Sequence, residues 1–359
     1  MSEETEEIVS AVFQSTEPQH IPALPHDFKP WHRERKQFIR EHQWNLQAER
    51  LINRYLSLTT DIEDVPDDAP DSVQVPEPLS CLVLPGDDLL DVRSLWQRIN
   101  KLGCWIKYIG FNSSQGSKHE GSRVYVATNA VNSLDKVVRS SEVLHDRFQS
   151  IGNPQSVAHK RMRNAGPYHI INLDICDSLF PVTTNDPTEY YKALREISQF
   201  QCERCTHPWL LFVTTQIEPA LKDDNGLAKL SDAVHQNCGG SPDFTAALHD
   251  LLARSVYSDG VAGLDLSNLA DEEIYRFFGV AFGKWLLQLV ATATPPWSVR
   301  LLASYRYTIK AGIAPMFSFA FLFQRHKPVA LQDKTGLSQS PIKVEKIYEE
   351  KKYALNLVT

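Results

Sequence analysis

Short apolar runs alternate with stretches of helical spacing through the middle of the chain. Each run is rich in β-branched or aromatic residues and bounded by turn-forming residues, which is typical of a buried strand. The predicted strands are residues 79–84, 105–111, 124–128, 168–173 and 209–214. The predicted helices are residues 89–102, 188–201 and a helix within 132–151, with a loop at 113–122 and a basic turn at 159–164. This alternation predicts a doubly wound, mostly parallel α/β sheet.

The pattern changes after residue 220. Residues 227–256 and 271–293 have the apolar spacing of helices, which predicts a helical insertion over about residues 225–293. Residues 297–309 and 316–324 are rich in β-forming residues, and only a short turn separates them. Two strands joined by so short a connection pair antiparallel. We therefore predict a C-terminal antiparallel hairpin.

Two acids mark the end of the predicted central strand. Gly166 and Pro167 lead into the apolar run, which stops at Asp174, and Asp177 follows shortly after. Parallel sheets bind their ligands at the carboxyl ends of the strands, so a polar cluster is expected to carry chemistry there. The alternative is that Asp174 caps the helix or turn that follows the strand.

The N-terminal segment, residues 1–57, combines a frayed acidic arm with a helix. From Phe38 onward the apolar residues recur at near-helical spacing, so one face of this helix is expected to dock on the core. Its start is basic and includes Arg33, Arg35, Lys36 and Arg40. Basic side chains interleaved with aromatic ones can hold phosphates and stack on bases. The alternative is a solvated basic face.

Three further segments complete the predicted organisation. Residues 58–78 are rich in Asp, Glu and Pro and predict a linker. Residues 79–330 form the α/β domain, and residues 331–359 form a charged tail.

The overall composition is that of an ordinary globular protein. The chain has 359 residues, of which 42% are hydrophobic and 23% charged, enough for one large α/β domain or two modest ones. The net charge of -7 argues against a protein that is basic overall and coats nucleic acid, but it leaves room for a local basic patch. No apolar run reaches the roughly 18 residues of a membrane-spanning helix, and the acidic start lacks the order of a signal peptide. We therefore expect a cytoplasmic protein without a membrane partner.

Six cysteines are spread along the chain, which favours reduced thiols over a disulfide framework. Cys202 and Cys205, with His207 beside them, are the only pair with metal-like spacing. A tetrahedral zinc site needs four ligands, and only His235 or Cys238 could complete one. The other interpretation is a helix end just before the strand at 209–214.

The order of elements over about residues 79–330 resembles the class I S-adenosylmethionine-dependent methyltransferases. The fold of that family is a three-layer, Rossmann-like sandwich with a seven-stranded, mostly parallel sheet closed by an antiparallel hairpin. The resemblance implies S-adenosylmethionine as a cofactor. It also implies that catalysis would consist mainly of aligning a nucleophile with the methyl group.

The resemblance also implies site residues. The family's first strand ends in a glycine-rich loop, and LVLPGDDLLD places Pro85, Gly86 and Asp87 there, although an aspartate in this loop could instead cap the next helix. Its second strand usually ends on an acid that bonds the ribose, and here YIGFN ends on Asn112. Its fourth strand ends beside the transferred methyl group, which INLDICDS would flank with Asp174 and Asp177, the implied catalytic residues.

Nucleic acid is the substrate class we expect, held by the basic helix. No DPPY-like motif and no Pro-Cys nucleophile occurs, so the usual routes of base methylation are not indicated. A P-loop, a GxGxxG fingerprint and a D…ExK arrangement are also missing, which argues against an NTPase, an NAD enzyme and a magnesium nuclease.

Three stretches, KPWHRERKQFIREHQW, LVLPGDDLLDVRSL and INLDICDSL, also resemble an uncharacterised bacterial family encoded in defence islands. That resemblance implies an anti-phage system with an ATPase or nuclease partner. The loop in LVLPGDDLLD has Gly86 as its only glycine, where the family has a glycine-rich loop. This difference supports a second hypothesis, in which the same fold is a catalytically inactive scaffold subunit of such a complex.

Overall fold

The computed structural model describes residues 34–56, 77–113, 118–179, 186, 188–217, 225–252, 271–308 and 315–326. The predicted arm and the charged tail lie outside these ranges, as do Arg33 and all but the last two residues of the predicted linker. No helix in the described part of the chain is both long enough and apolar enough to cross a membrane.

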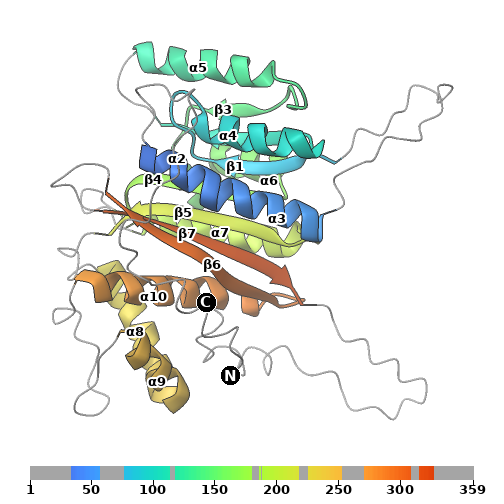
Figure 1. Cartoon of the computed structure of the whole chain (residues 1–359). Coiled ribbons are helices and arrows are strands. Elements are labelled where there is room, and N and C mark those ends of the chain that lie inside the picture. Colours follow the sequence, from blue (N-terminus) through green and yellow to red (C-terminus); the bar gives the residue numbers. More distant parts are fainter. Residues whose placement is uncertain are drawn as a thin grey trace, which may run out of the picture.

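A seven-stranded sheet forms the middle layer of the molecule, in the order β3-β2-β1-β4-β5-β7-β6 (Figure 1). Its strands are β1 (Leu79–Val83), β2 (Ile106–Phe111), β3 (Glu142–Leu144), β4 (Ile170–Ser178), β5 (Trp209–Gln216), β6 (Trp297–Tyr307) and β7 (Met316–Arg325). The first five are parallel, whereas β7 runs antiparallel to both β5 and β6. The mostly parallel sheet and its C-terminal antiparallel hairpin confirm the predicted methyltransferase-like, Rossmann-like sandwich.

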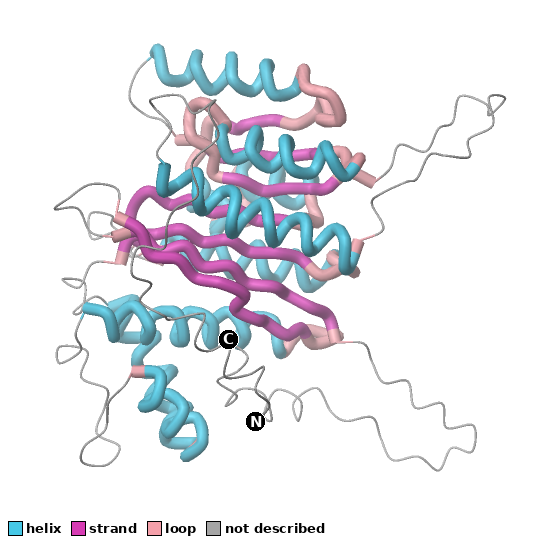
Figure 2. The backbone as a smooth tube through the Cα atoms, in the orientation of Figure 1, coloured by secondary structure: helices cyan, strands magenta, loops and turns pink. Residues whose placement is uncertain are grey.

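Helices cover both faces of the sheet (Figure 2). One face carries α4 (Leu90–Ile99), η2 (Asn100–Leu102), α5 (Lys118–Asn132) and the N-terminal helix, a continuous unit of α2 (Glu34–Ile39), η1 (Arg40–Asn45) and α3 (Leu46–Tyr55). The other face carries η3 (Phe148–Gly152), α6 (Val157–Ala165), α7 (Glu189–Arg204) and α10 (Asp271–Ala291), with α8 (Asn225–Gly240) and α9 (Pro242–Leu251) beside α10. The helices predicted at residues 89–102, 188–201 and 271–293 are confirmed. Residues 227–251 are helical as predicted, but they form two helices that divide at Ser241, and residues 253–256 lie outside the described residues.

The N-terminal helix is part of the core. Its inward face buries Ile39, Trp44, Ala48, Leu51 and Ile52, and these side chains belong to one apolar cluster with residues of β5 and β7. The middle of the helix is π-helical, with ordinary right-handed helical geometry at both junctions. The predicted docking of this helix on the core is therefore confirmed.

The prediction for residues 124–128 was wrong. They belong to α5, which begins at Lys118 inside the predicted loop. Val124, Ala127 and Val131 are buried at helical spacing, while Tyr125 is 69% exposed. A five-residue apolar run is too short to distinguish the spacing of a helix from the alternation of a strand.

The true third strand, β3, lies within the stretch predicted as a helix, and no α-helix spans residues 133–151. All three residues of β3 are only partly buried, so this edge strand has no hydrophobic pattern to reveal it. Residues 159–164 are not a turn either, because they lie in α6, whose first turn is capped by Ser156 accepting from the His159 N–H.

Candidate functional site

Two cations of the N-terminal helix meet two acids at the carboxyl end of the sheet. We define the strand-end cluster as Lys36, Arg40, Asp91 and Asp174. Lys36 and Arg40 are four residues apart and therefore project from the same side of the helix. Asp91 lies in the first turn of α4, which follows β1, and Asp174 lies near the end of β4.

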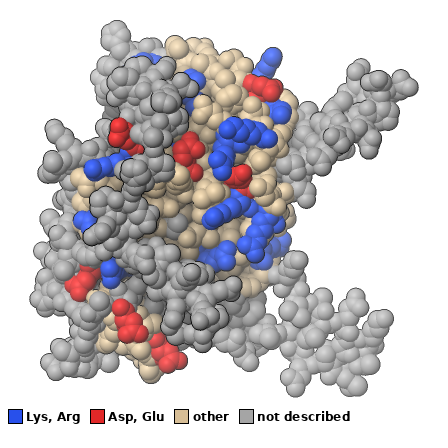
Figure 3. Space-filling model, viewed as in Figure 1, with Lys and Arg blue, Asp and Glu red and all other residues tan. Residues whose placement is uncertain are grey.

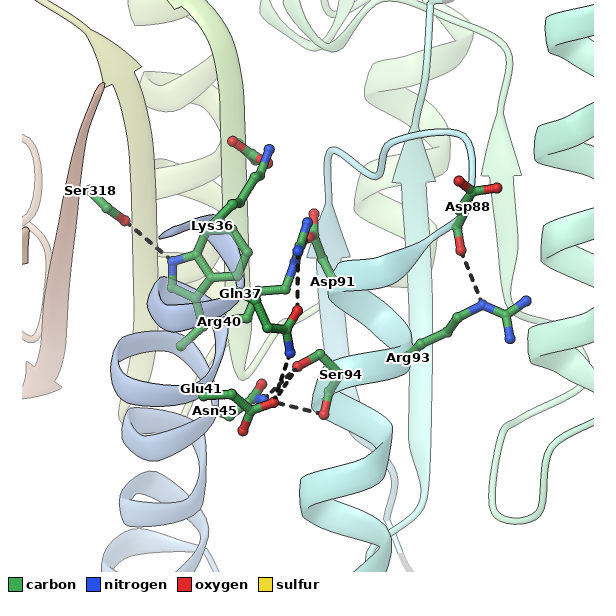
Figure 4. A network of polar contacts seen from close by, with 12 residues as sticks. Lys36, Gln37, Arg40, Glu41, Asn45, Asp88, Asp91, Arg93, Ser94 and Ser318 are labelled. Atoms are coloured by element: carbon green, nitrogen blue, oxygen red, sulfur yellow. Dashed lines mark hydrogen bonds and ion pairs between the residues drawn. The ribbon is translucent and has the colours of Figure 1, made fainter. Parts of the chain in front are cut away.

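Figure 4 shows the side chains of the N-terminal helix and α4 turned toward one another, and both ion pairs of the cluster are largely buried. The Arg40 Nε donates to Asp91 Oδ1 at 2.6 Å, and the two side chains are 6% and 4% exposed. Lys36 pairs with the Asp174 carboxylate, where the side chains are 16% and 4% exposed. The sequence predicted Asp174 as a strand-end acid, but it did not reveal that a cation from the distant N-terminal helix neutralises it.

Hydrogen bonds next to the cluster fix the helix against α4. Arg40 Nη1 donates to Gln37 Oε1 at 3.3 Å, and the Gln37 amide donates to Glu41 at 3.1 Å. Ser94 Oγ donates to Glu41 at 3.1 Å and accepts from the Asn45 amide at 2.8 Å. Because these contacts link one helix to the other at several points, the two helices are held as a unit.

A second buried network attaches the same helix to β7. The Gln43 amide donates to the Ser318 carbonyl at 2.9 Å, and Ser318 Oγ donates back to Gln43 Oε1 at 2.5 Å. Gln43 and Ser318 are both fully buried. Buried polar groups satisfied in this way resist separation, since opening would leave them without partners.

The electrostatics of Asp174 depend on its burial and its neighbours. Burial raises the pKa of Asp174, and the nearby Asp91 carboxylate raises it further, while Lys36 and Arg40 oppose both effects. Its Oδ1 is buried and has no hydrogen-bond partner among the described residues. Losing Lys36 would therefore leave a poorly solvated carboxylate. Asp174 lies within β4, and the segment that directly follows Leu179 lies outside the described residues, so the alternative role as a cap stays a prediction.

The implied cofactor residues lie together on the loops after β1 and β2. Asn112 Nδ2 donates to the Pro85 carbonyl at 3.0 Å, so the predicted ribose-binding amide links the two loops instead. A Cβ atom built on Gly86 meets no heavy atom within 4 Å, so the space there is open. The structure thus brings Pro85, Gly86, Asp87 and Asn112 to one end of the sheet.

Neither Asp87 nor Asp88 caps α4. The N-cap is Leu89, a buried residue with left-handed backbone angles (φ 51°, ψ 35°) and no capping side chain. The Asp88 carboxylate instead accepts from Arg123 at 3.2 Å, and its carbonyl accepts from Arg93 at 3.0 Å. The alternative prediction, that an aspartate of this loop caps the next helix, was therefore wrong.

The predicted nucleic-acid residues of the N-terminal helix are separated by the structure. Lys36 and Arg40 point inward to the acids, and the exposed Arg35 donates to the Thr308 carbonyl. Arg33 lies outside the described residues, and Arg35, Lys36 and Arg40 do not form one outward basic face.

The side chain of Asp177, the second implied catalytic residue, also lies outside the described residues.

Two hollows lie beside predicted site residues. A cavity of about 10 Å³ between the N-terminal helix and the sheet is lined by Trp44, Asp91 and Asn172, and this space is about the size of one water molecule. A wider hollow of about 370 Å³ lies between α5 and β3, where Asn112 contributes to its wall. This cavity beside the strand-end cluster is therefore too small to hold a cofactor.

The cysteine pair does not form a metal centre with its described neighbours. Cys205 Sγ lies 3.4 Å from His207 Nδ1, but the described part of the chain contains no group of three His, Cys, Asp or Glu side chains placed to hold a metal. Burial raises the pKa of both Cys202 and Cys205 to about 12, so neither thiol is a thiolate near neutral pH.

Comparison with known proteins gave one family. The family model described as PP_RS20740-like matches residues 25–359, nearly the whole chain. The search of curated proteins found no match.

Proposed function

The chain belongs to the PP_RS20740-like family, and we propose that it uses a methyltransferase-like fold as a non-catalytic scaffold. The observation that carries this proposal is the strand-end cluster. Lys36 and Arg40 pair with Asp174 and Asp91 at the end of the sheet where a cofactor and substrate would meet. Fold alone does not determine function, so the proposal depends on this site and not on the sheet.

Opening the strand-end cluster would separate two largely buried ion pairs and the hydrogen bonds beside them. A ligand that needs the open state would bind more weakly, by about 10-fold for every 1.4 kcal/mol of free energy that opening costs. The closed arrangement thus supports a structural use of this end of the sheet.

As part of this proposal, the scaffold would serve a bacterial anti-phage assembly. The sequence resemblance to a defence-island family supports this placement and an ATPase or nuclease as the partner. Co-purification with the products of neighbouring genes would support it, and a chain that purifies alone from such co-expression would contradict it.

The second candidate function is S-adenosylmethionine binding and methyl transfer. The open space at Gly86 and the hollow beside Asn112 favour it. In that case the cofactor would lie along the loops after β1 and β2, outside the closed cluster. Asp174 could act only if Lys36 moved away.

Calorimetric titration with S-adenosylmethionine and S-adenosylhomocysteine distinguishes the two functions. The scaffold proposal expects no saturable heat at millimolar ligand. Micromolar binding that is lost in Gly86→Trp and weakened in Asn112→Ala would contradict it and establish the second candidate. The two variants serve as each other's control, because one blocks the open space and the other removes an amide.

A further inference from the structure

A groove lined by arginine side chains lies between α3 and β6, away from the strand-end cluster. We define the arginine groove by Arg50 and Arg54 of α3 and Arg300 of β6, with Tyr55 at its side and Leu51 and Leu322 in its floor. Its volume is about 210 Å³. Figure 1 shows β6 as the outermost strand next to β7, so the groove lies toward this edge of the sheet.

The three arginines are exposed and have no acidic partner within the described part of the chain. No ion pair joins any of them to another described residue, whereas the neighbouring Glu49 is already held by Arg98 at 2.7 Å. Figure 3 shows Lys and Arg side chains gathered on this face, over α3 and α4. A local positive field therefore stands out on a chain whose net charge is -7.

The arrangement follows from the two elements that form the groove. Arg50 and Arg54 are four residues apart on the outer side of the helix, while Leu51 turns inward to the core. Arg300 lies opposite Leu322 in the β6–β7 register, on the sheet face that α3 covers. The Arg54 guanidinium is 5.6 Å from the centre of the Tyr55 ring.

We propose that the arginine groove binds the phosphate backbone of a nucleic acid. Guanidinium groups present paired N–H donors that match phosphate oxygens, and three of them can contact successive phosphates. Tyr55 provides a ring on which an adjacent base can stack. The inference does not depend on the proposed scaffold function, because the groove shares no residue with the strand-end cluster.

Neither a helix dipole nor a membrane surface accounts for the whole groove. Arg54 near the C-terminus of α3 is stabilised by the helix dipole, but that effect does not reach Arg300 on the neighbouring strand. An anionic membrane would also attract arginines. However, the large apolar side chains that are exposed in the described residues, Tyr125, Val126 and Val157, belong to α5 and α6, so the groove offers none to insert into a bilayer.

The experiment measures fluorescence anisotropy of a labelled single-stranded oligonucleotide over a series of salt concentrations. The variant carries Arg50→Glu, Arg54→Glu and Arg300→Glu. Its matched control carries Arg139→Glu, Lys160→Glu and Arg204→Glu, which are exposed cations elsewhere and give the same change in net charge. Circular dichroism of all three proteins checks that each is folded.

We expect the groove variant to bind the oligonucleotide at least about 10-fold more weakly than the wild type. The slope of log affinity against log salt concentration should also be smaller in magnitude by about 1 for each phosphate that the variant no longer binds. The control should keep most of the wild-type affinity and salt slope. Equal affinity and slope in the groove variant would overturn the proposal, as would absence of wild-type binding at low salt. Binding to phosphatidylserine vesicles, or equal competition by inorganic phosphate at the same charge concentration, would assign the groove to a lipid or a free anion instead.

Discussion

Replacing Arg40 with methionine is expected to lower the free energy of unfolding by about 3–5 kcal/mol, because it leaves a buried carboxylate without its cation. Asp91 is 4% exposed at its side chain and accepts from the Arg40 Nε at 2.6 Å. Methionine fills much of the arginine stem volume, so the destabilisation reflects mainly charge and hydrogen bonding. Urea unfolding followed by circular dichroism measures the change.

Two further variants make this result specific. Arg98→Met breaks the more exposed pair with Glu49, whose side chains are 37% and 25% exposed, and is expected to cost at most about 1 kcal/mol. The double variant Arg40→Met and Asp91→Leu should recover most of the stability, since no charge then remains unpaired. If Arg40→Met costs no more than Arg98→Met, the strand-end cluster does not hold the helix in place.

Replacing Trp44 with alanine is expected to cost about 3–5 kcal/mol of unfolding free energy. The indole is 4% exposed, lies 6.4 Å from the Phe212 ring of β5 between ring centres, and directs its N–H toward Ser318 of β7 at 3.4 Å. The substitution creates a cavity between the N-terminal helix and the sheet. Thermal and urea unfolding both measure the destabilisation.

The control for Trp44→Ala is Asn53→Ala, on the exposed side of the same helix, which is expected to change stability by at most about 0.5 kcal/mol. A small effect of Trp44→Ala, comparable to that of Asn53→Ala, would mean that the helix can leave the sheet at little energetic cost. The helix would then be an appendage, and the strand-end site would be accessible.

The central strands could be predicted because the residues that identify each of them are adjacent in the sequence. A strand buried on both faces, such as β5, is a nearly continuous apolar run, which is typical of a strand when the run is short and bounded by turn-forming residues. The hairpin of β6 and β7 followed from two such runs and a short connection. In contrast, β3 is a short edge strand whose partly exposed residues carry no pattern, so its pairing with β2 depends on tertiary structure alone.

The candidate site could be predicted only in part, for a similar reason. Asp174 and Asn112 follow recognisable strands, so their place at one end of the sheet was accessible from the sequence. Lys36 and Arg40 were predicted to belong to an outward basic face. The sequence alone does not show whether a charged residue of an amphipathic helix faces solvent or a buried acidic partner. Their four-residue spacing, near inward residues such as Trp44, was the available signal.

Hydrogen–deuterium exchange of the N-terminal helix, with and without S-adenosylmethionine, tests the central claim most directly. If the N-terminal helix is a fixed part of the core, the amides of Arg40–Asn45 and Leu46–Tyr55 should exchange as slowly as those of β4. The ligand should then leave these exchange rates unchanged. Exchange much faster than in β4, slowed when the ligand is added, would show that the helix is a movable lid over a working cofactor site.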